Sequence, residues 1–152
     1  QEPKSAEKVH WAIGCYVVEM GAWTSEIEMG LDSVFLTPPG VLFLDTTSVE
    51  VPLAPPYLPP ALRVVPLVPW AGAPYLAGSW RPITSYEGVS LNWTNGFSGF
   101  FVNAERRGED LEGVAQSYWD FPREDQTAEI RLRRIPCGSV RDLSRELSGR
   151  RG

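Results

Sequence analysis

The sequence has 152 residues, of which 43% are hydrophobic and 11% aromatic, so it can bury one substantial core and is not expected to be disordered. Its 14 Lys and Arg residues against 19 Asp and Glu residues give a formal charge of −5, which offers nucleic acid no basic surface. Pro, Gly and charged residues interrupt every apolar run before it reaches the roughly 18 residues of a membrane-spanning helix. We therefore expect one globular domain that neither spans a membrane nor binds nucleic acid.

The polar segment from Gln1 to Lys8 is typical of residues that follow a removed signal peptide, so a secreted or periplasmic location is expected. We divide the chain into an N-terminal arm (1–12), a β domain (13–137) and a C-terminal tail (138–152).

Apolar and polar residues alternate through most of the first half, which is the period of half-buried strands. The sequence predicts strands at Ile13 to Met20, Trp23 to Met29, Val34 to Leu36, Val41 to Thr46, Leu62 to Val68 and Leu76 to Ile83. Pro38-Pro39-Gly40 is a turn signal and predicts a hairpin between the third and fourth of these segments.

The second half has a clearer pattern. Strands are predicted at Val89 to Thr94, Gly99 to Arg106, Leu111 to Trp119 and Thr127 to Ile135. Asn95-Gly96 is a strong hairpin signal between the first two. Sequential short strands without interleaved helices predict an all-β fold, an antiparallel up-and-down β-barrel of about eight to ten strands, with a β-sandwich as the alternative.

Two segments differ from this pattern. Residues 52–74 contain eight prolines among apolar residues, which predicts an ordered loop rather than a central strand. After Cys137, Ser139 is a candidate N-cap, and Val140, Leu143 and Leu147 have helical spacing. A short C-terminal helix is expected, with a frayed basic tail as the alternative.

The chain has two cysteines, Cys15 at the start of the first predicted strand and Cys137 after the last. Closing an even-stranded meander places the first and last strands side by side and antiparallel, so a disulfide between these cysteines would join the barrel seam. The alternative is a pair of buried thiols in a reducing compartment.

No catalytic or metal-binding signature is present. His10 is the single histidine, and neither a Gly-x-Ser-x-Gly nucleophile motif nor a Gly-rich phosphate loop occurs. One histidine and a disulfide pair cannot form a zinc site. The carboxylates Asp32, Asp45, Glu105 and Asp120 show no spacing that selects a catalytic pair. No cofactor and no metal are expected.

Aromatic residues are dense, with six Trp, five Tyr and six Phe. In a small barrel some of these fill the interior and a few can line a cavity or its mouth. The predicted ligand-binding residues are Tyr57, Trp70, Tyr75, Trp80, Trp93, Phe101 and Trp119.

These features resemble the lipocalin and wider calycin group of secreted β-barrels. The resemblance covers roughly Trp11 to Leu147 and depends on Trp11, on Gly14-Cys15-Tyr16, on the strand series and on Arg131, Arg133 and Arg134. In such families an aromatic residue after the glycine is covered by a basic residue from the last strand. Here Tyr16 stands where a Trp is usual, and the proline-rich insertion and the first-to-last-strand disulfide are departures. Gly96-Phe97-Ser98-Gly99 with Trp119-Asp120-Phe121-Pro122-Arg123 is also similar to segments of secreted bacterial proteins.

The resemblance implies a non-catalytic binding protein that holds a small apolar molecule in a barrel cavity, with the proline-rich segment beside the entrance. Two alternatives remain: a small barrel enzyme of the isomerase or cyclase type with a buried carboxylate, and a filled β-sandwich that binds another protein. The sequence gives no oligomeric state.

Overall fold

The computed structural model describes residues 10–24, 35–51, 60–119 and 125–139. The strands are β1 (Gly14–Met20), β2 (Val41–Val49), β3 (Ala61–Pro66), β4 (Ala77–Ile83), β5 (Gly88–Thr94), β6 (Gly99–Arg107), β7 (Asp110–Tyr118) and β8 (Thr127–Ile135), followed by a 3-10 turn, η1 (Cys137–Ser139).

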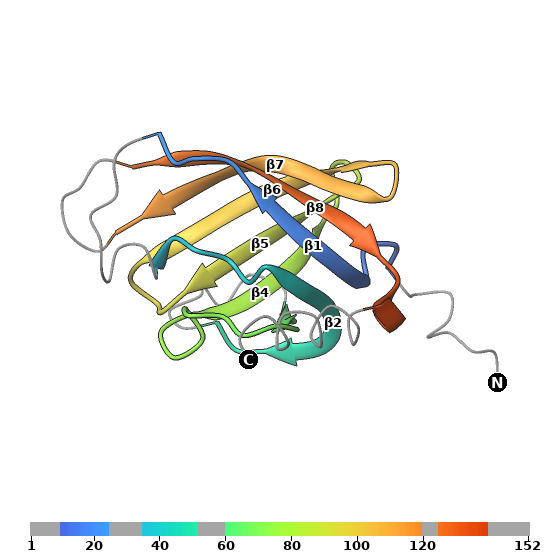
Figure 1. The fold of residues 1–152 in the computed structure, drawn as a ribbon, viewed down its shortest axis with the longest axis horizontal. Coiled ribbons are helices and arrows are strands. Elements are labelled where there is room, and N and C mark those ends of the chain that lie inside the picture. The colour runs from blue at the N-terminus through green and yellow to red at the C-terminus, as the bar shows by residue number, and fades with distance from the viewer. Residues whose placement is uncertain (1–9, 25–34, 52–59, 120–124, 140–152) are drawn as a thin grey trace, which may run out of the picture.

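The eight strands form a closed antiparallel barrel in which each strand pairs with the next and β8 pairs with β1 (Figure 1). This confirms the all-β, up-and-down barrel and excludes the β-sandwich. Closure gives every strand a neighbour on both sides, which stabilises the sheet and limits edge-to-edge aggregation.

The alternation read from the sequence sets the two faces of the wall. In β5 the side chains of Val89, Leu91 and Trp93 are fully buried, while Ser90 and Asn92 lie half-buried on the outside. The Asn95-Gly96 hairpin forms as predicted between β5 and β6, because the Asn95 carboxamide oxygen accepts hydrogen bonds from the main-chain N–H groups of Phe97 and Ser98, both at 2.8 Å.

Large apolar side chains from all parts of the wall meet inside the barrel. The largest fully buried ones are Trp80, Trp93, Tyr16, Phe100, Leu36, Leu42, Leu44, Leu91, Leu111, Leu132, Val89 and Val102. They belong to one continuous core cluster. Side chains thus occupy the centre, as an eight-stranded barrel allows.

The disulfide between Cys15 and Cys137 is present at the barrel seam. Cys15 lies opposite Ile135 in the β1–β8 ladder, and the Cα atoms of the two cysteines are 5.2 Å apart. Figure 1 shows the start of β1 beside the end of β8, so the bond joins the two ends of the meander. The prediction made from cysteine placement is confirmed.

The strand predicted at Val34 to Leu36 is wrong in the described residues, and of the one predicted at Trp23 to Met29 only Trp23 and Thr24 are described, in no strand. Phe35 and Leu36 lie in no strand, so the expected hairpin at Pro38-Pro39-Gly40 does not form, and β2 pairs with β1 instead. Leu36 is buried in the core cluster, and its carbonyl accepts a hydrogen bond from the Trp23 indole N–H at 3.1 Å. These apolar residues therefore cover the barrel core rather than form its wall. Residues 25–34 lie outside the described residues.

The strand predicted at Leu62 to Val68 is present as β3, residues 61–66, so the proline-rich segment 52–74 is not a loop throughout. In β3, Val64 belongs to the core cluster and Leu62 packs against it, and Pro66 stands at the strand end opposite Leu42. A proline is tolerated there because the ladder is ending. The predicted C-terminal helix and tail, 140–152, lie outside the described residues.

Candidate ligand-binding pocket

The end of the barrel where β1 begins is closed by the residues that precede it. The His10 ring lies between two indoles, with its centroid 4.9 Å from that of Trp11 and 5.6 Å from that of Trp80. Burial and the nearby Arg106 guanidinium lower the pKa of His10, so its neutral form is favoured more than in a free histidine. Trp11 and Trp80 both pack with the core at this end of the barrel.

Arg134 from β8 holds the segment before β1 against the end of the barrel. Its guanidinium donates hydrogen bonds to the Trp11 carbonyl at 2.6 Å and to the Ile13 carbonyl at 2.5 Å, and it lies over the Tyr16 ring. A Cβ atom on Gly14 would stand 2.6 Å from an Arg134 nitrogen, so only glycine leaves room for this approach. Burial raises the pKa of the Tyr16 hydroxyl, against the opposing effect of Arg134.

The barrel wall is weakest between β3 and β4. Only two register pairs join these strands, Leu62 with Trp80 and Arg63 with Ser79. Beyond them the strands part, and a pocket of about 300 Å³ lies at the parting. Its lining residues are Val49, Glu50, Val51, Arg63, Val64, Pro66, Trp70, Ala73, Leu76, Ala77, Gly78, Ser79 and Thr94. Most of them are apolar, and the size suits one small molecule.

The inner wall of this pocket touches the core through Gly78 and Val64. Gly78 is the register partner of Trp93, and a Cβ atom on Gly78 would stand 2.8 Å from the Trp93 indole nitrogen. The Trp93 ring stacks on Phe100 with a centroid separation of 5.0 Å. A ligand in the pocket would therefore lie close to the aromatic part of the core.

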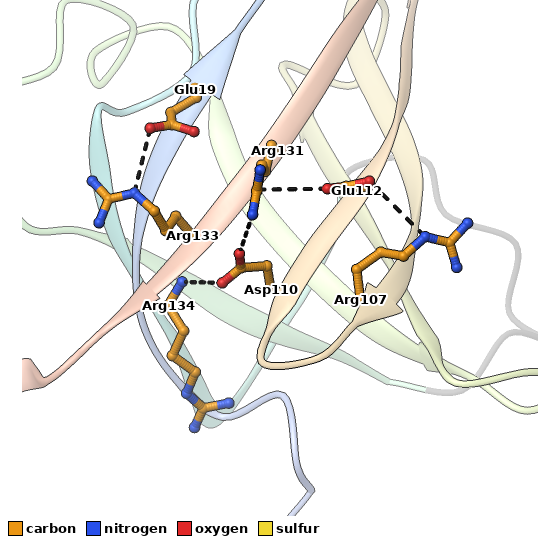
Figure 2. Close-up of polar contacts among 7 residues, drawn as sticks. All are labelled: Glu19, Arg107, Asp110, Glu112, Arg131, Arg133 and Arg134. Atoms are coloured by element: carbon orange, nitrogen blue, oxygen red, sulfur yellow. Dashed lines mark hydrogen bonds and ion pairs between the residues drawn. The ribbon is translucent and has the colours of Figure 1, made fainter.

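A second hollow, of about 1000 Å³, lies over the outer face of β6, β7, β8 and β1. Charged side chains border it and form exposed ion pairs with one another (Figure 2), such as Arg131 with Glu112 at 3.5 Å and Arg107 with Glu112 at 3.9 Å. Exposed pairs of this kind are solvated and contribute little to stability. This hollow is open and charged, so it suits an apolar ligand less well than the smaller pocket.

The predicted ligand-binding residues do not form one group. Trp70 lines the pocket, and its indole N–H donates to the Thr37 carbonyl at 2.6 Å. Tyr75 is 48% exposed, and its ring centroid is 6.1 Å from that of Phe35. Trp80 is part of the core, and its indole N–H donates to the Asp45 carbonyl.

Of the others, Trp93 is fully buried in the core beside the pocket, and Trp119 is partly buried and packs against the core. Phe101 lies on the outer face of β6, with its ring centroid 6.2 Å from that of Tyr118. Tyr57 lies outside the described residues. The structure thus places Trp70 in the pocket lining, Trp93 in the core behind Gly78, and Phe101 elsewhere.

The sequence interpretation missed the small residues of the pocket, chiefly Gly78, Ser79 and Thr94. The ligand-binding residues were predicted from aromatic side chains. The pocket instead lies where β3 and β4 cease to pair. The available signal was Gly78 within a predicted strand, since a glycine there often marks a close approach by another group.

Within the described ranges, no cluster of three or more His, Cys, Asp or Glu side chains could hold a metal ion. The same residues contain no helix with the length and apolar character needed to cross a bilayer. Comparison with protein families, characterised proteins and solved structures gave no match.

Proposed function

We propose that this protein is a non-catalytic, lipocalin-like binding protein that holds a small apolar molecule in the pocket between β3 and β4. The disulfide indicates an oxidising, extracytoplasmic compartment. The proposal specifies a secreted or periplasmic protein that carries or sequesters its ligand there.

The observation that carries the proposal is the pocket of about 300 Å³ with its apolar lining. Its apolar lining residues include Val49, Val51, Pro66, Trp70 and Leu76. Contact with such side chains removes apolar ligand surface from water, which favours binding by about 25 cal/mol for each Å². A preformed pocket also reduces the ordering cost of binding.

The position of the pocket supports this assignment. Core side chains fill the barrel centre, so the parting in the wall, where Val64 and Gly78 line the pocket, is where a ligand can approach the core. The residues after β3, including Trp70, border this route, in keeping with an entrance beside the proline-rich segment.

The enzyme alternative requires a desolvated carboxylate. The buried polar side chains of the described residues are Ser79, Thr94, Ser98, Ser117 and Gln126, which are all uncharged. The hydrogen bond from Arg131 lowers the pKa of the Asp110 carboxyl, which marks a stable anion rather than a raised-pKa acid. No specific observation favours the enzyme.

The test is a fluorescence titration with phenylnaphthylamine, an uncharged apolar dye. The wild-type protein should bind one molecule of dye. Ala77→Trp, which fills the pocket from an exposed position, should weaken binding at least about ten-fold. Ala22→Trp places the same side chain at the charged outer hollow and is the matched control, with affinity unchanged. Equal affinities in all three proteins would reject the pocket as the binding site.

A further inference from the structure

The indole N–H of Trp93 is buried and has no hydrogen-bond acceptor in the structure. Three other tryptophans, Trp23, Trp70 and Trp80, each donate to a main-chain carbonyl, at distances of 3.1, 2.6 and 2.9 Å. Buried polar groups are paired in nearly all native proteins, because an unpaired donor has lost its hydrogen bond to water. The Trp93 side chain is wholly buried, so this unpaired donor requires an explanation.

The unpaired donor faces the pocket wall. A Cβ atom built on Gly78 would stand 2.8 Å from the Trp93 indole nitrogen and 3.1 Å from the Val64 Cβ atom. Gly78 and Val64 both line the pocket. The indole nitrogen therefore lies directly behind these two residues, and a side chain at residue 78 would press against it.

We propose that the pocket selects a neutral carbonyl compound with an apolar body, whose oxygen accepts a hydrogen bond from the Trp93 indole N–H. This inference rests on the proposed function and specifies the class of ligand. The apolar body lies along Trp70 and Leu76, and the carbonyl group passes between Gly78 and Val64. The Val64 side chain moves aside to admit the oxygen, because the nitrogen is covered in the free protein.

The surroundings of Trp93 favour a ketone, aldehyde, ester or amide over a carboxylate. Phe100 stacks on its indole, Gly78 lies beside the indole nitrogen and Val64 lies beside Gly78, and none of the three carries a charge. A carboxylate buried there would lose its hydration without gaining a cation, at a cost that one indole N–H cannot offset. Arg63 lines the pocket, but it is exposed and lies on the opposite side of β3 from the adjacent Val64.

The test uses three fluorescent naphthalenes that share one ring system. Prodan carries a dimethylamino group and a propionyl group, dimethylaminonaphthalene lacks the carbonyl, and dimethylaminonaphthoate carries a carboxylate in its place. The wild-type protein should bind prodan more tightly than either of the others. In Trp93→Phe the ratio of prodan affinity to dimethylaminonaphthalene affinity should fall about three- to ten-fold, the net value of one hydrogen bond.

Trp80→Phe is the matched control, because it removes another buried indole N–H, one that is already paired with the Asp45 carbonyl. Its affinity ratio should equal that of the wild type. An unchanged ratio in Trp93→Phe, with both dyes still bound, would overturn the carbonyl inference and leave the proposed function standing. Failure of the wild type to bind any of the dyes would reject both.

A measurement on the wild-type protein tests the same hydrogen bond even if Trp93→Phe does not fold. In a nitrogen-15 correlation NMR spectrum, the assigned Trp93 indole N–H resonance should move downfield when prodan is added and should not do so with dimethylaminonaphthalene. Equal movement with both dyes, or none with prodan at saturation, would overturn the inference.

Discussion

The guanidinium carbon of Arg134 lies 5.4 Å from the centre of the Tyr16 ring, and one guanidinium nitrogen is 3.1 Å from the Tyr16 hydroxyl oxygen. The same guanidinium binds the carbonyls of Trp11 and Ile13, so a single side chain from the last strand holds the segment that leads into the first. Together with the disulfide, it fastens the barrel seam.

We expect Arg134→Met to lower the free energy of unfolding by about 2 to 4 kcal/mol, because it removes several charge-assisted hydrogen bonds from a partly buried site. Arg133→Met is the matched control on the adjacent residue, where only an exposed ion pair with Glu19 is lost, and its cost should be below about 0.5 kcal/mol. Urea unfolding of both variants measures the difference. Similar costs for the two would show that Arg134 does not anchor the seam.

Reduction of the disulfide, or replacement of both Cys15 and Cys137 by Ala, should destabilise the protein while the barrel persists. The two residues are 122 positions apart, and the chain-entropy model gives an upper figure of about 5 kcal/mol for a loop of this order. Thermal unfolding followed by circular dichroism measures the loss. A far-ultraviolet spectrum that loses its β signal at room temperature would show instead that the fold depends on the bond.

The alternation of residues was sufficient to predict β5 to β8 nearly residue by residue, because each of these strands has one buried and one solvated face. It also placed Cys15 and Cys137 at a common seam. The structure around Phe35 and Leu36 could not be predicted in this way. Both residues pack on the core from a segment outside the sheet, and three or four apolar residues in sequence cannot distinguish such a segment from a strand.

The pocket was less accessible to sequence reasoning than the fold. Trp70 was identified by its aromatic character, but the partners Val64 and Gly78 depend on how far β3 and β4 stay paired. The number of residues over which β3 and β4 stay paired depends on the register of the whole barrel, and no local sequence pattern determines that register. Phe101 was selected as an aromatic residue on a strand and lies on the outer face, because Phe100 and not Phe101 is in phase with the buried residues of β6.

Trp93→Ala should lower the free energy of unfolding by about 3 to 5 kcal/mol, because the whole indole is buried against Phe100. Trp119→Ala should cost less, since that side chain is only partly buried. Chemical denaturation of the two variants measures both values. A cost below about 1 kcal/mol for Trp93→Ala would be incompatible with its position in the core.

Asp110 should make stability depend on pH in the acid range. Its pKa is lowered by the hydrogen bond from Arg131 and by that from the main-chain N–H of Arg134. Because the folded pKa lies below the unfolded one, the stabilisation is fully present above the unfolded value of about 4 and is lost as the pH falls through the folded pKa.

Asp110→Asn should therefore be less stable than the wild type at neutral pH, and the difference should shrink as the pH falls below about 4. Glu19→Gln removes only an exposed ion pair with Arg133 and should have little effect at either pH. Melting temperatures across this range test the prediction. A wild-type advantage over Asp110→Asn that persists unchanged in strong acid would contradict it.

Chemical-shift mapping with phenylnaphthylamine tests most directly whether the pocket between β3 and β4 is a ligand site. At saturation, we expect the largest changes in backbone amide resonances at Val64, Leu76, Gly78 and Thr94, which line the pocket on its different sides. Changes concentrated instead at Glu105, Glu112 and Arg131 on the charged outer face, or no change at any amide, would contradict the proposed function.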